Sequence, residues 1–105
     1  MQTQTEMLAN ILRETAYLMA EDENPHWAER LYSDAKKLES GDIDGAEDFL
    51  RSFGGMGSLD DIYGRPGKNK PEEEKVLIEL ICDRIDIAHR LASKLTWELR
   101  NEHRA

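Results

Sequence analysis

Three carboxylates on the last predicted helix are the clearest candidates for metal chemistry. Glu79, Asp83 and Asp86 follow one another at steps of four and three residues, which places them on one side of a helix. Helical nucleotide pyrophosphohydrolases hold magnesium between paired Glu-x-x-Glu and Glu-x-x-Asp helices. This chain has a single set with a different spacing, and Arg90 follows Asp86 at ion-pair distance along a helix. A small metal-dependent hydrolase of nucleotide-like substrates is therefore an alternative prediction.

The stretch FGGMGSLDDIYG over residues 53–64 could cradle a phosphate or turn the chain sharply. A P-loop requires a lysine after its glycines, and none follows here, while two aspartates would repel phosphate. An acid three residues after the serine is the spacing of a capping box. We favour a tight corner between helices, built from Gly54, Gly55, Met56, Gly57, Ser58 and Asp61.

Other metal-like patterns fail on their spacing. The segment 40–51 resembles a calcium loop, but Arg51 stands where a bidentate glutamate is needed. Cys82, Asp86 and His89 can share one helix flank, yet no further ligand has tetrahedral zinc spacing. The sequence therefore predicts no metal, no cofactor and no catalytic residues.

Charge is distributed unevenly along the chain. The net charge is −8, from 14 basic and 22 acidic residues, and residues 1–50 hold the whole acidic excess. Such a field repels nucleic-acid backbones and anionic membranes and attracts basic protein surfaces. We therefore expect a basic protein partner, with neither nucleic acid nor membrane; the alternative is a charge that serves solubility alone.

Aromatic side chains lie within the acidic segment 21–48. Trp27 and Tyr32 suit the anchoring of a protein partner, although both also fit the inner face of a helix. The predicted partner-binding residues are Glu21, Asp22, Glu23, Trp27, Glu29, Asp34, Asp42, Asp44 and Asp48.

Apolar periodicity and capping residues predict an all-α fold, a single helical bundle of three short helices packed on one long C-terminal helix. In the second helix Trp27, Leu31 and Tyr32 are expected to face inward, and Asp34 to face water. The expected helices cover about 3–20, 25–39, 43–53 and 72–102, with the glycine loop and an exposed connection over 54–71.

The long helix has apolar residues on more than one stripe, so two of its sides need cover. Either the other helices wrap around it or a second copy of the chain packs against it. The sequence thus also permits a homodimer through this helix, and a purely structural or oligomerisation module is a further alternative.

The glycine loop resembles the GGMGS loop of a family of short uncharacterised bacterial proteins, in which an apolar residue and Asn-Asp follow. Here Leu59 and Asp61 match and Asp60 replaces the asparagine. That family is similar in size and helical character to toxin-immunity proteins. Small size, the acidic first half and the lack of a catalytic pairing lead us to predict a non-catalytic immunity protein that neutralises a cognate toxin, such as a secreted toxin domain, through its acidic surface.

Two local features bear on location. Cys82 is the single cysteine, so an internal disulfide is excluded. The N-terminal MQTQTEML lacks the basic and apolar segments of a signal peptide, and a cytoplasmic location is expected.

Overall fold

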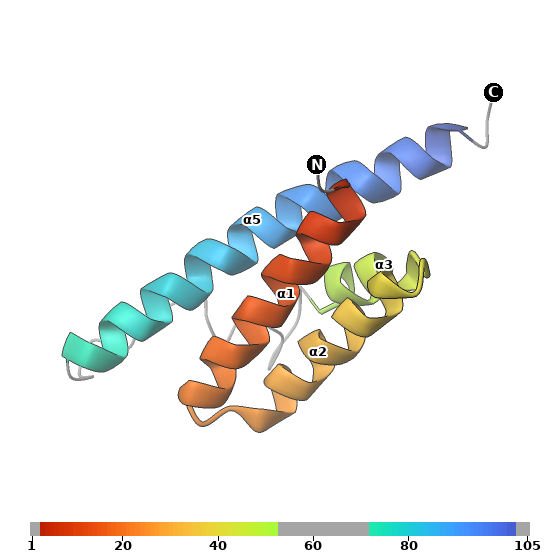
Figure 1. Ribbon diagram of the computed structural model, residues 1–105. Coiled ribbons are helices and arrows are strands. Elements are labelled where there is room, and N and C mark those ends of the chain that lie inside the picture. The colour runs from red at the N-terminus through yellow and green to blue at the C-terminus, as the bar shows by residue number, and fades with distance from the viewer. Residues whose placement is uncertain (1–2, 53–71, 103–105) are drawn as a thin grey trace.

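The computed structural model describes residues 3–52 and 72–102, with side chains of the last helix described from 75 to 98. Within these residues the chain forms helices and no strand, which confirms the all-α class (Figure 1). The helices are α1 (Gln4–Glu21), α2 (Pro25–Glu39), α3 (Asp44–Leu50) and α5 (Glu72–Glu102).

Local sequence explains where the short helices begin and end. The Thr3 side chain accepts a hydrogen bond of 3.1 Å from the Glu6 amide at the start of α1. Pro25 occupies the first turn of α2, where its missing N–H is not needed. Gly41, with φ +86°, follows the end of α2, and the Asp42 carboxylate then accepts from the Asp44 amide at 3.0 Å.

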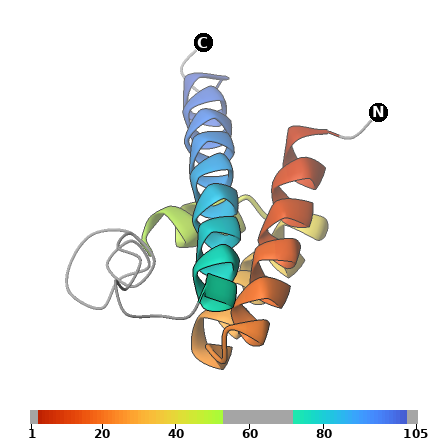
Figure 2. The ribbon, with the colours of Figure 1, turned by 90° about the vertical axis from the view of Figure 1, so that its left-hand side faces the viewer.

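Helices α1 and α2 form an antiparallel hairpin, and α5 lies across it (Figure 1). The short helix α3 bridges α2 and α5, on the other flank of α5 from α1 (Figure 2). Helix α5 has 31 residues and is about 46 Å long at 1.5 Å per residue. It packs against α1 and α3, whereas α2, which was also predicted to pack on the long helix, packs mainly against α1 and α3.

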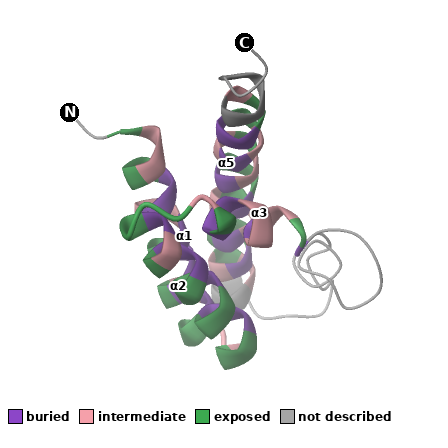
Figure 3. Cartoon of the chain, turned by 90° about the vertical axis from the view of Figure 1, so that its right-hand side faces the viewer, coloured by how far each residue is buried: buried purple, intermediate pink, exposed green. Residues whose placement is uncertain are grey.

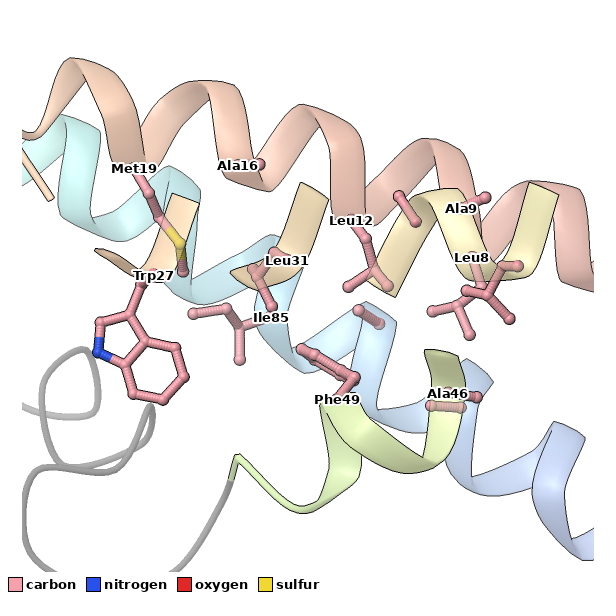
Figure 4. Packing of buried hydrophobic residues seen from close by; sticks show 14 of the residues in the cluster. Leu8, Ala9, Leu12, Ala16, Met19, Trp27, Leu31, Ala46, Phe49 and Ile85 are labelled. Atoms are coloured by element: carbon pink, nitrogen blue, oxygen red, sulfur yellow. The ribbon is translucent and has the colours of Figure 1, made fainter. Parts of the chain in front are cut away.

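One apolar cluster fills the space between the helices. Phe49 of α3 is fully buried in it, beside residues of α1, α2 and α5 (Figure 4). The facing sides of the helices are buried and their outer sides exposed (Figure 3). The largest fully buried apolar side chains are Leu8, Leu12, Met19, Leu31, Phe49 and Ile81.

Two side chains of α2 lie on the opposite side from the one predicted. Asp34, expected to face water, is 3% exposed, and Tyr32, expected to face the core, is 45% exposed. The reason is that α2 is covered by α1 on one side and by α3 on the other, and α3 packs over the side that carries Asp34. None of the described helices combines the length and the apolar content that crossing a bilayer requires.

Candidate functional site

The carboxylates predicted to bind a partner are divided between the two ends of α2. Glu21 and Glu23 lie at the α1–α2 turn, whereas Asp42 and Asp44 lie beyond the C-terminal end of α2. The 15 residues of α2 separate these groups by roughly 20 Å. The structure therefore does not bring the predicted residues together into one site.

Three of the residues predicted to contact a partner are buried or already paired within the protein. Trp27 is 5% exposed and belongs to the core, so its indole is not available to a partner. Asp34 is also buried. Asp48 is half-buried, and it is paired with Lys37 of α2 and, at 3.3 Å, with Arg51. Trp27 packs in the core, and Asp48 joins α3 to α2 through Lys37, so neither they nor the buried Asp34 contribute to an open acidic surface.

Asp34 lies in a charged cluster between α2 and α3. Its Oδ2 atom is buried and has no hydrogen-bond partner among the residues that the structure describes. Burial, reinforced by the neighbouring Asp48 carboxylate, raises the pKa of Asp34 to about 7, while Lys37 and Arg30 act in the opposite direction. The hydrogen bond from Lys37 to Asp48, and their opposite charges, raise the pKa of Lys37 above its ordinary value. This cluster links the two helices.

An exposed aromatic face was not predicted and lies along α1 and α2. Tyr17 is 67% exposed, and with Tyr32 it flanks a groove of about 350 Å³ at the seam between the helices. The floor of this tyrosine groove is apolar because small side chains line it there. Its residues are Arg13, Ala16, Tyr17, Ala28, Glu29 and Tyr32.

The exposed Tyr17 side chain separates several surface hollows and lines each of them. On its other side, a hollow of about 610 Å³ is lined by Met7, Ile11 and Glu14 among others, and a smaller one includes Arg84. The exposure of Tyr17 could have been predicted from the sequence. Tyr17 falls outside the apolar stripe of the first helix, so its ring faces water.

The charge around the tyrosine groove is acidic at the α1–α2 turn. Arg13 is paired with Glu39, and Arg84 lies 3.4 Å from the Glu14 carboxylate, whereas Lys36 lies over the Tyr32 ring with its Nζ 4.9 Å from the ring centroid. Within the described part of the chain, Glu21, Glu23 and Glu29 have no ion-pair partner. Glu21 lies one helical turn after Tyr17, which places uncompensated negative charge next to the exposed ring.

The carboxylates on α5 lie on the surface. Glu79, Asp83 and Asp86 are exposed, and Asp86 pairs with Arg90 at 3.2 Å. Among the residues that the structure describes, no three His, Cys, Asp or Glu side chains are grouped closely enough to hold a metal. Burial and the charges of Asp83 and Glu79 raise the pKa of the half-buried Cys82 thiol.

A family model described as a domain of unknown function (DUF6966) matches residues 20–72. The chain belongs to this family. The DUF6966 match covers α2, α3 and the glycine-rich sequence, and hence the buried Asp34 cluster and the acidic turn. The predicted loop residues Gly54, Gly55, Met56, Gly57, Ser58 and Asp61 fall within the match but outside the described residues. Neither a curated protein nor a solved structure matches the chain significantly.

Proposed function

We propose that this DUF6966 protein is a non-catalytic protein-binding domain that binds a basic partner on the α1–α2 face. The observation that supports this proposal is the tyrosine groove, which exposed Tyr17 and Tyr32 flank and Glu29 lines. Among the described residues, Glu29 and the carboxylates Glu21 and Glu23 of the α1–α2 turn have no ion-pair partner. Tyrosine is enriched among residues that dominate binding energy, because a large, stiff ring loses little entropy when it is buried. Nearby negative charge speeds the encounter with a basic surface.

The most concrete form of this proposal is an immunity protein, acting in the cytoplasm, that covers the basic substrate-binding surface of a cognate toxin. Small size, an acidic first half and the resemblance of the glycine loop to short bacterial proteins support it. A toxin that acts on nucleic acid or nucleotides needs a positively charged site, and an acidic face can occupy that site by charge complementarity.

The test begins with a tagged copy of the protein, expressed in and purified from the organism whose genome encodes it. We expect a basic protein to co-purify with the wild type and to be lost with Tyr17→Ala/Tyr32→Ala. The recovered protein is then titrated against each variant. Loss of the two rings should weaken binding at least tenfold, about 1.4 kcal/mol or more.

Charge reversal separates the two acidic groups. Reversal at Glu21, Glu23 and Glu29 to lysine should slow association and reduce its dependence on salt. Reversal at Asp42 and Asp44 makes the same kind of change some 20 Å away, at the other end of α2, and serves as the control. If only the control variant loses binding, the partner docks at the α2–α3 end and the proposed face is wrong. If neither variant loses binding, the acidic surface is not the recognition element.

A further inference from the structure

Helix α5 carries a second apolar stripe on the side away from the core. Val76, Leu80, Ile87 and Trp97 are 54%, 41%, 48% and 67% exposed. Their spacing of four, seven and ten residues keeps them on one line along the helix. The buried residues of the same helix, among them Ile81, Ile85 and Ala92, point the opposite way.

The outer stripe, defined as Val76, Leu80, Asp83, Ile87, Arg90, Lys94 and Trp97, follows a continuous pattern of steps of three and four. Its ends are about 32 Å apart at 1.5 Å per residue. Single exposed apolar residues need no explanation, but a line of this length is typical of a helix that packs against another helix. Helices α1 and α3 pack against other sides of α5, so neither covers the stripe (Figure 2).

Charge along this side of α5 changes sign near its middle. Glu79, Asp83 and Asp86 come first, and Arg90 and Lys94 follow, whereas Lys75 before them and Glu98 after them have the opposite signs. Two parallel copies would place acid against acid and base against base. Two antiparallel copies place the acidic half of each helix against the basic half of the other, which is the favourable arrangement.

An antiparallel register with residue i opposite residue 173 − i pairs opposite charges and joins the apolar residues at the two ends of the stripe. Asp83 then faces Arg90, and Glu79 faces Lys94, twice each because the interface is two-fold symmetric. In the same register Val76 meets Trp97 at both ends. Leu80 lies opposite Ser93, and Ile87 lies opposite Asp86, one residue from Ile87 of the second copy beside the symmetry axis.

We propose that the outer stripe of α5 binds a second copy of this chain in an antiparallel, two-fold symmetric helix pair. The intrahelical ion pairs compete only weakly with this interface. Arg90 pairs with Asp86 at 3.2 Å and Lys94 with Glu98 at 4.0 Å; the first three side chains are largely exposed and that of Glu98 is half-buried. Such exposed pairs contribute little, so both cations can turn toward the partner copy.

The first test is the oligomeric state of the full chain, measured by sedimentation equilibrium over a wide concentration range. We expect a monomer–dimer equilibrium for the wild type, and at least a tenfold larger dissociation constant for Ile87→Glu. Tyr17→Glu is the control, because it also places a carboxylate at an exposed apolar position, 67% exposed against 48% for Ile87, but lies on α1. A wild type that stays monomeric at millimolar concentration overturns the proposal, as does a dimer that Ile87→Glu leaves unchanged.

Disulfide trapping tests the orientation, in a Cys82→Ser background that leaves no other thiol. Glu79→Cys mixed with Lys94→Cys should form a crosslinked heterodimer under oxidation, because these positions face each other in the antiparallel register. Each variant alone should crosslink poorly. Efficient crosslinking of Glu79→Cys with itself indicates parallel helices and contradicts the proposed arrangement.

The dimer and the proposed partner binding use different surfaces, and their tests fail separately. Ile87→Glu should leave binding of the basic partner at the tyrosine groove intact. Tyr17→Ala/Tyr32→Ala should leave the dimerisation constant unchanged.

Discussion

Gly45 of α3 rests directly on the backbone of Asp34 in α2. A Cβ atom added at Gly45 would lie 2.4 Å from the Asp34 carbonyl oxygen and 3.0 Å from Cγ of Leu38. Only glycine permits so close an approach of two helix backbones. This contact brings α3 over α2, where it buries the Asp34 side chain and places Asp48 next to Lys37.

Gly45→Ala should destabilise the fold by about 1–3 kcal/mol, because the obstacle is backbone and α3 has to move away from α2. The comparison is with Gly41, which has open space around it but a φ of +86°. Asparagine tolerates the left-handed region, so Gly41→Asn should cost little, whereas Gly45→Asn should cost at least as much as Gly45→Ala. Urea denaturation measures both. Equal losses at the two positions would contradict the close-contact explanation.

Asp34 should make the protein less stable as pH rises from about 4 to 7. The unfolded chain releases this proton near the ordinary pKa of 3.8, whereas the folded chain holds it up to about 7. The folded state therefore binds more protons in that window, and its stability falls with pH by about 4 kcal/mol at most. Well below pH 4 the group is neutral in both states, and this cost is absent.

Asp34→Asn removes this titration and should flatten the pH dependence. We expect the variant to gain stability relative to the wild type at pH 8 and to gain much less at pH 4.5, in urea melts at both values. The difference between the two proteins cancels the other titrating groups. An unchanged slope between pH 4.5 and 8 would mean that Asp34 titrates normally.

Asp48→Asn should lower the pKa of Asp34. The substitution removes the like charge that raises this pKa, and it releases Lys37 to act on Asp34 alone. Asp44→Asn, an exposed carboxylate on the same helix, is the control and should leave the titration in place. Carboxyl carbon NMR shifts of Asp34 followed against pH provide the measurement, and equal shifts in both variants would contradict the cluster's electrostatics.

Trp27→Ala should lower the stability of the fold much more than Tyr32→Ala. Trp27 is 5% exposed, so its truncation should cost about 3–5 kcal/mol of stability. Tyr32 is 45% exposed, with Lys36 Nζ 4.9 Å from its ring centroid, and its truncation should change stability by less than about 1 kcal/mol. Thermal denaturation separates the two. A large loss of stability in Tyr32→Ala would place that ring in the core after all.

The sequence was sufficient for what is local. Thr3, Pro25 and Gly41 mark helix ends because caps and allowed backbone angles depend on a few neighbouring residues. Apolar periodicity then indicated an all-α chain, and the breadth of the apolar set on α5 already required cover on two sides.

Tertiary packing decided which side of each helix is closed. Periodicity gives the direction of a side chain around its own helix, but it does not tell which other helix packs against that side. Tyr32 and Asp34 were therefore assigned to the wrong environments, since α3 packs on the Asp34 side and leaves the Tyr32 side open. Likewise the predicted carboxylates are close in the sequence, but α2 places them at its two ends. Tyr17 and Tyr32 are far apart in the sequence, and only the packing of α1 against α2 brings them to the same groove.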